Sequence, residues 1–341
     1  MRILMIDVNC KYSSTGKIVY DLYTNLRKEG HKAAVCYGRG KLVKEPGIYK
    51  FGLDWETCLH AVLSRLTGYN GCFSYFSTKR LLRYIDRFKP DLIHIHELHG
   101  YFVNISPLLV YLKKKGIKVV WTFHCEYMYT GKCGHSYECE KWKRECGTCP
   151  HLRDYPKSFF FDRTRKMLQR KKELLKDLDL IIVTPSQWLA KRVKESFLKD
   201  KEVRVIHNGI DTSVFQFADD GFNLKRKLGI PQKNKVVLSV APNIMSAGKG
   251  GAWVLKLSET VKDKNITFVL VGGKIQRQRD NVIEVGKISD QRELARYYSM
   301  ADVFVICSQR EVFPTTCIEA QCCGALVVGF DAGGVRETQV G

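Results

Sequence analysis

The segment 308–320 holds the residue types best suited to chemistry in this 341-residue chain. It reads Ser-Gln-Arg-Glu-Val-Phe-Pro-Thr-Thr-Cys-Ile-Glu-Ala, with two acids, Glu311 and Glu319. An apolar run before it predicts a strand, and the residues after Pro314 predict a helix, so the N–H groups between them should face the phosphate-binding edge of a parallel sheet. A carboxylate is a hydrogen-bond acceptor, and helix-start amides favour an anion. The segment could hold two ends of one ligand, although acids at this spacing also occur on ordinary surfaces.

Three further residues stand at the ends of predicted strands or in the loops that follow them. Lys249 precedes a glycine pair in a predicted loop, where an ordinary surface lysine would also be expected. Gly16 belongs to Ser-Ser-Thr-Gly-Lys at 13–17, which is not a P-loop because no glycine stands five residues earlier. His124 ends a predicted strand, a position that a core histidine could also occupy.

Four cysteines are crowded into a short polar stretch at the spacing C-x5-C-x6-C-x2-C. They are Cys133, Cys139, Cys146 and Cys149. This spacing suggests one tetrahedral structural zinc, with reduced thiols or a disulfide pair as the alternatives. The surrounding insertion, 125–155, looks too polar to build its own core. The histidines His94, His96 and His99 have no carboxylate or cysteine at ligand spacing, so no metal is expected there.

The elements that must position these residues alternate between short β-branched runs and helical patterns, which predicts α/β domains with parallel sheets. Expected strands lie at 2–6, 32–36, 91–96, 118–123, 180–183 and 203–206, and then at 235–240, 266–271, 282–285, 303–306 and 325–330. Expected helices lie at 17–29, 78–88, 105–115, 163–176, 187–196, 252–261, 291–299 and 315–323. Ser77 and Ser186 are the expected caps of two of them. The turn at 207–211 predicts a boundary between domains 1–206 and 207–341, the second of which we expect to be incomplete at its C-terminal end.

The formal net charge of +21 predicts anionic partners. Basic residues gather at 163–176, where seven Lys or Arg accompany one Glu. A solvated helix face and a surface for anionic lipid are both compatible with that pattern. No nucleic-acid-binding motif accompanies the charge, so no nucleic-acid partner is expected. The absence of a signal-peptide pattern or a long apolar run predicts a cytoplasmic protein. If the basic stretch binds anionic lipid, the protein would contact the inner face of the cell membrane peripherally.

The segment 308–320 resembles the E-x7-E motif of glycosyltransferase family four, a large retaining family with the GT-B fold. The likeness continues through 323–329 and 333–337. Further blocks agree at 90–96 with 100–101, at 121–124 (Trp-Thr-Phe-His), and at 208–211 with Phe215. The resemblance spans essentially the whole chain and is closest to capsule and exopolysaccharide transferases in which spaced cysteines follow the Trp-Thr-x-His block.

This resemblance implies an α/β GT-B protein with two Rossmann-like doubly wound domains facing a cleft, the donor held mainly by the second and the acceptor by the first. It also implies roles for individual residues. Glu311 would bind the donor sugar, and Glu319 would bind the ribose. Lys249 would bind the diphosphate, together with the backbone at Phe313, Pro314 and Thr315. Gly16 would approach the donor, and His124 would lie beside the reacting sugar.

The function implied is retaining transfer of a sugar from a UDP- or GDP-sugar to a glycan or lipid-linked acceptor in surface polysaccharide biosynthesis, with no cofactor needed for catalysis. Two departures from the family stand out. Many relatives carry an arginine shortly before the phosphate lysine, but residues 241–248 before Lys249 contain none; Lys274 could compensate for it. Many relatives also have Asp after the histidine, whereas Cys125 and Glu126 follow His124 here. The alternatives are a non-catalytic nucleotide-sugar or polysaccharide-binding protein and a GT-B nucleotide-sugar epimerase.

Overall fold

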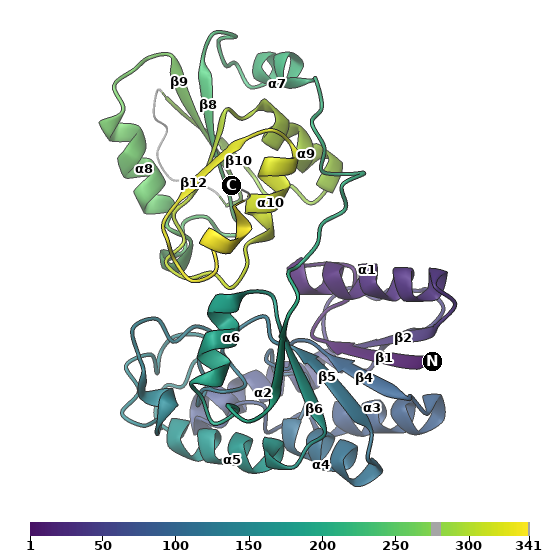
Figure 1. Ribbon diagram of the computed structural model, residues 1–341. Coiled ribbons are helices and arrows are strands. Elements are labelled where there is room, and N and C mark those ends of the chain that lie inside the picture. The colour runs from purple at the N-terminus through teal and green to yellow at the C-terminus, as the bar shows by residue number, and fades with distance from the viewer. Residues whose placement is uncertain (274–280, 340–341) are drawn as a thin grey trace. The chain divides into compact units, whose positions relative to one another are not determined.

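The computed structural model describes residues 1–273 and 281–339 and divides into two compact units, Met1–His207 and Asn208–Gly341 (Figure 1). The division falls one residue beyond the boundary expected from the turn at 207–211. Each unit contains one parallel sheet, as the alternation of strands and helices predicted. None of the described helices has the length and apolar character needed to cross a bilayer.

The first unit is built on a seven-stranded sheet in the order β3-β2-β1-β4-β5-β6-β7. Its strands are β1 (Arg2–Asp7), β2 (Lys32–Tyr37), β3 (Ile48–Lys50), β4 (Leu92–Ile95), β5 (Lys118–Thr122), β6 (Leu180–Thr184) and β7 (Glu202–Val205). Its helices are α1 (Ser14–Lys28), α2 (Asp54–Thr67), α3 (Tyr75–Phe88), α4 (Ile105–Lys115), α5 (Thr164–Lys176) and α6 (Gln187–Lys194). Helices α3, α4 and α5 lie side by side on one face of the sheet, and α1 lies on the other (Figure 1). Within β1, the residues from Ile3 to Ile6 are all apolar and buried because both faces of the sheet are covered.

The second unit has a five-stranded sheet in the order β10-β9-β8-β11-β12. Its strands are β8 (Lys235–Val240), β9 (Ile266–Val271), β10 (Val282–Val285), β11 (Val303–Ile306) and β12 (Leu326–Gly329), and its helices are α7 (Gly221–Lys227), α8 (Gly251–Thr260), α9 (Gln291–Met300) and α10 (Thr315–Cys322). One core cluster packs α7, α9 and α10 against the sheet, and a second contains α8, so both faces are covered.

Helix α2 was not expected, and its polarity explains why. Its buried side is polar and includes Glu56 and His60, whereas most of its large apolar side chains are exposed. The Glu56 carboxylate accepts the backbone N–H groups of Phe76 and Ser77 at 2.8 and 2.7 Å, which is a favourable position for a negative charge at the start of α3. Helix α3 therefore begins at Tyr75, and the prediction of Ser77 as its cap was wrong. The cap at Ser186 is confirmed, because its side chain accepts the N–H of Leu189.

The insertion after β5 has irregular structure apart from one 3₁₀ turn, Lys141–Lys143. Contrary to the expectation from its polarity, it has a small core, in which the rings of Tyr129 and Trp142 meet edge to face at 5.0 Å. The fully buried carboxylate of Glu126 bonds to Arg192 on α6 at 2.6 Å. The insertion is thus fixed to the domain by packing and by a buried ion pair.

Each sheet reverses its strand order next to its first strand, between β1 and β4 in the first unit and between β8 and β11 in the second. In doubly wound sheets, ligands bind at the carboxyl ends of the strands at such a switch point. The loops after these four strands are therefore the places to look for a functional site.

Candidate functional site

In the second unit, Lys249 follows β8 and Glu311 follows β11, so the switch point brings together two residues that are 62 apart in the chain. The Lys249 ammonium donates to Glu311 Oε1 at 2.6 Å. The two loops touch through their backbones, because Gln309 N–H donates to the Gly248 carbonyl at 3.0 Å. Gly250 has φ +72°, and a Cβ there would lie 1.9 Å from the Cys307 carbonyl oxygen. Only glycine allows the backbone at position 250 to come this close to Cys307, and this close contact of the two loops holds the Lys249 ammonium beside the Glu311 carboxylate.

The backbone of Glu311 is held on its other side by the loop after β12. Glu311 and Gly333 form a parallel bridge, and Gly334 N–H donates to the Glu311 carbonyl at 2.9 Å. Gly333 has φ +74°, and a Cβ there would lie 2.0 Å from the same carbonyl oxygen. The Glu311 side chain is thus carried on a rigid segment at the rim of the sheet.

Helix α10 starts at Thr315, directly after the buried residues Phe313 and Pro314. Glu319 lies one turn further on and is mostly buried. Its carboxylate accepts the hydroxyl of Tyr298 at 3.0 Å. Burial raises the pKa of Glu319, against the hydrogen bonds from Tyr298 and Thr315. The start of α10 offers backbone N–H groups to an anion. One turn further along the helix, the Glu319 carboxylate is held in place as a hydrogen-bond acceptor. Lys274 lies outside the described residues.

In the first unit, Asp7 ends β1 and receives hydrogen bonds from across the switch point. Its Oδ1 accepts the backbone N–H of Glu97 at 3.0 Å, and its Oδ2 accepts the Thr15 hydroxyl at 3.3 Å. Burial raises the pKa of Asp7 to about 7. Gly16 lies in the first turn of α1, where its N–H donates to Ser13 Oγ at 3.3 Å. A Cβ on Gly16 would lie 3.1 Å from the Asn9 Cβ, so the glycine keeps the loop close to the helix start.

Sequence reasoning missed a cluster at the ends of β4 and β5. Glu97 Oε2 lies 2.8 Å from His99 Nε2 and accepts the Cys125 thiol at 3.3 Å. Burial raises the pKa of Glu97, but the neighbouring His99 imidazolium outweighs that effect and lowers it to about 2. Burial lowers the pKa of His99, and Glu97 more than reverses this, so its net shift is upward. The expectation that no carboxylate or cysteine accompanies His99 was therefore wrong, because Glu97 lies two residues before it and Cys125 comes from the loop after the neighbouring strand β5.

His124 stands beside this cluster and shares a hydrogen bond of 3.0 Å between its Nε2 and His96 Nδ1. His94 in turn meets the Thr122 hydroxyl at 2.8 Å. Burial lowers the pKa of His124 and lowers that of His94 to about 4. At neutral pH these imidazoles are uncharged, so His124 is suited to exchange a hydrogen bond with a neutral hydroxyl rather than to bind an anion.

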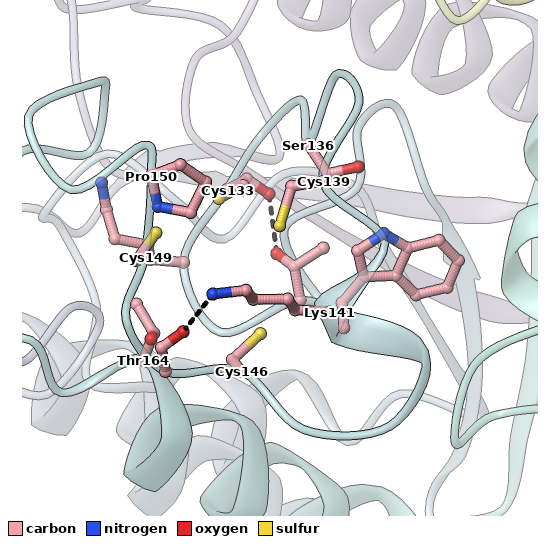
Figure 2. Close-up of a pocket in the computed structure, with 12 residues that line it drawn as sticks. Cys133, Ser136, Cys139, Lys141, Cys146, Cys149, Pro150 and Thr164 are labelled. Carbon is pink, nitrogen blue, oxygen red and sulfur yellow. Dashed lines mark hydrogen bonds between the residues drawn. The ribbon is translucent and has the colours of Figure 1, made fainter.

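The four clustered cysteines all line one cavity in the insertion, together with Ser136, Lys141, Pro150 and Thr164 (Figure 2). The structure therefore brings together the four residues that the spacing singled out. Among the four, the thiol of Cys133 forms a direct hydrogen bond with the sulfur of Cys149.

Comparison with known sequences covers nearly the whole chain. Residues 15–214 match the family described as Glycosyltransferase Family 4, and residues 220–340 match Glycosyl transferases group 1. The chain is also 26% identical over 353 aligned residues to the protein named as the colanic acid biosynthesis glycosyl transferase WcaC of Escherichia coli K12, covering 99% of this chain and 85% of that protein.

Solved structures with the same fold include sucrose-phosphate synthase from Thermosynechococcus elongatus, with a TM-score of 0.68 at 16% identity, covering 100% of this chain and 84% of the other. Another is the Anabaena protein HepE in complex with UDP-glucose, with a TM-score of 0.66 at 16% identity, covering 100% and 83%. At this identity the likeness shows the fold alone, and it confirms the predicted GT-B class.

Proposed function

The chain belongs to glycosyltransferase family 4, and on that premise we propose that it is a retaining enzyme that transfers a sugar from a nucleoside diphosphate sugar. The nucleotide would be UDP or GDP. The acceptor would be a glycan or a lipid-linked molecule in surface polysaccharide biosynthesis. The resemblance to WcaC favours the polysaccharide assignment. The observation that carries the donor half is the Lys249–Glu311 pair at the β8/β11 switch point, next to the start of α10.

This arrangement suits the two ends of a sugar diphosphate. The start of α10 and the Lys249 ammonium supply positive potential for the diphosphate, which gains charge as the sugar leaves. Glu311, on its fixed loop, can accept hydrogen bonds from sugar hydroxyls. Glu319 can accept from a ribose hydroxyl. No side chain in this set is placed as a nucleophile, so positioning and electrostatics carry the proposed chemistry.

We propose that transfer follows the family's same-face route. The bond from the sugar's anomeric carbon to the phosphate oxygen breaks as the bond to the acceptor oxygen forms. The acceptor's proton passes to the departing phosphate. The neutral His124 would orient a hydroxyl, and the Asp7, Glu97 and His99 group supplies the polar wall around it.

A donor panel tests the proposal. The full chain is mixed with labelled UDP- and GDP-sugars, with and without a lipid-linked acceptor, and release and transfer are followed. One nucleoside diphosphate should raise the melting temperature, since a ligand at a hundred times its Kd stabilises the native state by about 2.7 kcal/mol. Lys249→Ala should weaken that shift, whereas Lys256→Ala, an exposed lysine on α8, should not.

The alternatives give different results in the same assay. Nucleotide-sugar binding without release or transfer to any acceptor would indicate a binding protein. Conversion of the donor sugar to its epimer without transfer would indicate an epimerase. If no nucleoside diphosphate changes the melting temperature, the donor site itself is assigned wrongly.

We further propose that α2, rather than α5, contacts an anionic membrane that carries the lipid-linked acceptor. In α5 the apolar residues Met167, Leu168 and Leu175 are buried, as is Lys171, and Arg165 pairs with Glu145. That helix therefore presents only part of the charge that the sequence suggested and no apolar face.

Helix α2 exposes an apolar stripe instead, at the i, i+4, i+7 spacing of one helix face. Its members are Trp55, Leu59, Val62 and Leu66. Exposed Phe159, Phe160 and Phe161 lie next to its end, because Phe159 N–H donates to the Arg65 carbonyl at 2.8 Å. No acidic residue occurs between Glu56 and Asp86, while Lys79 and Arg83 are exposed on α3. An exposed apolar face that is followed in the chain by exposed basic residues, with no acid before Asp86, suits an anionic bilayer surface.

Liposome co-sedimentation tests this contact. Binding should be stronger to anionic than to neutral vesicles and should weaken about tenfold or more in Leu59→Ser/Leu66→Ser, since burying each leucine contributes about 1.5–3 kcal/mol. Val110→Ser, which alters an exposed apolar residue on α4, is the matched control. Equal binding to both vesicle types, or a double variant that binds like wild type, would refute the contact.

A further inference from the structure

The cavity in the insertion is lined by every cysteine that the chain has between residues 126 and 306. Cys133 and Cys139 come from the start of the insertion, and Cys146 and Cys149 from the loop after its 3₁₀ turn. Gly147 and Thr148 both have positive φ, at 133° and 43°. That turn brings Cys146 and Cys149 to the wall of the same cavity (Figure 2). A Cys-x2-Cys turn opposite a second cysteine pair is the usual construction of a closed tetrahedral zinc site.

Hydrogen-bond donors lie beside two of the four sulfurs. The backbone N–H groups of Gly131 and His151 hydrogen-bond to the sulfurs of Cys146 and Cys149, and the Cys133 thiol bonds to Cys149. Groups that donate to the ligand atoms orient them for the metal and stabilise their negative charge. Two of the four sulfurs therefore already have the donors that a metal-bound thiolate would use.

Charge balance is the second, independent observation. Lys132 and Lys171 are both buried beside the insertion. The Lys132 ammonium donates to the carbonyls of His151, Leu152 and Asp154, and that of Lys171 to the carbonyls of Tyr127 and Thr130. Across residues 1–273 and 281–339 neither forms an ion pair with a carboxylate. Burying an uncompensated charge is unfavourable. One Zn²⁺ with four thiolates has a net charge of −2, which these two ammonium groups would balance.

We propose that Cys133, Cys139, Cys146 and Cys149 bind one structural Zn²⁺, with Lys132 and Lys171 compensating its tetrathiolate charge. Four thiols lose four protons as one Zn²⁺ binds. Among the described residues only Glu97, His99 and Cys125 bring three possible ligand atoms within 4.8 Å of one another, so the four sulfurs must turn inward to reach Zn–S distances of about 2.3 Å. The proposal is independent of the assigned transferase activity.

The site also links the insertion to the residues around His124. Tyr155, at the far end of the insertion, has its hydroxyl 3.4 Å from His99 Nδ1. A metal that fixes the loop between Cys133 and Cys149 would therefore fix one wall of the His99 and Glu97 cluster.

The full chain purified without chelator should contain about one zinc per chain by elemental analysis. Cys146→Ser/Cys149→Ser should remove it, whereas Cys58→Ser/Cys322→Ser, which changes two exposed cysteines, should keep it. Because the first variant could fail to fold, wild type reconstituted with Co²⁺ gives a second readout. Thiolate-to-cobalt charge-transfer and tetrahedral d–d bands are expected. A reduced, folded wild type that contains no zinc and gives no such bands would overturn the proposal.

The role of the lysines has its own measurement. Lys171→Met should lose zinc to a chelator at roughly tenfold lower chelator concentration, as for groups that support metal ligands. Its exposed neighbour Lys172 provides the control variant, Lys172→Met. Equal zinc retention in Lys171→Met, Lys172→Met and wild type would overturn the charge-balance part of the proposal.

Discussion

Glu311→Ala should abolish measurable sugar transfer while leaving nucleoside diphosphate affinity nearly unchanged. The proposed partners of Glu311 are sugar hydroxyls, and losing two hydrogen bonds to a charged acceptor removes roughly 3 kcal/mol or more, a factor of at least a hundred in kcat/KM. The Lys249 ammonium remains and is released from its ion pair, so the diphosphate keeps its cation. Steady-state transfer kinetics and calorimetric titration with the nucleoside diphosphate measure the two effects separately.

Glu319→Ala is the reciprocal variant. It removes a buried acceptor that bonds to Tyr298 and, in our assignment, to the ribose, so nucleotide affinity itself should fall. The two variants therefore divide the donor into a sugar end and a nucleoside end. If both retain full transfer activity and full nucleotide affinity, the donor-site assignment is wrong, whatever the acceptor.

The second large effect is on stability. Arg192→Ala should destabilise the first unit by about 3–5 kcal/mol, because it leaves the Glu126 carboxylate buried without its cation. The same guanidinium also donates to Ser136 Oγ at 2.6 Å, so the variant removes a link between α6 and the insertion at two points. For a domain of this size the melting temperature should fall by about 10 °C. Thermal unfolding followed by circular dichroism measures the change.

Arg204→Ala is a suitable control, since Arg204 pairs with Glu202 on the exposed surface of β7 and such pairs contribute about 1 kcal/mol or less. The double variant Glu126→Leu/Arg192→Met should be more stable than Arg192→Ala, because it buries no unpaired charge. Equal melting temperatures for Arg192→Ala and Arg204→Ala would contradict the role given to the buried pair.

Most strands were predictable because parallel strands covered on both faces appear as continuous apolar runs, such as Ile3 to Ile6. Helix α2 was not, because prediction from apolar periodicity assumes that the apolar side is inside. Here Glu56 and His60 are buried through specific hydrogen bonds to α3 and to Ser74, which the sequence does not reveal.

The candidate site divides in the same way. Glu311 and Glu319 are close in the chain and could be placed on a strand end and a helix from the local pattern. The contact of Glu97 with Cys125 depends on the register of β4 against β5, which the chain's local pattern does not specify. The contact of Lys249 with Glu311 likewise depends on β8 and β11 being neighbours, and only the family resemblance gave both residues roles beforehand.

The ion pair between Lys249 and Glu311 makes the two halves of the proposed donor site thermodynamically linked. A diphosphate that draws the ammonium away leaves the Glu311 carboxylate with unused acceptor capacity, which sugar hydroxyls can then fill. Each half of the donor would thus bind more tightly when the other is present, and the coupling free energy must be the same in both directions. A free sugar meets a carboxylate that is already engaged, so it competes poorly with the intact nucleotide sugar. Selectivity for the activated donor over the unactivated sugar follows from that one interaction.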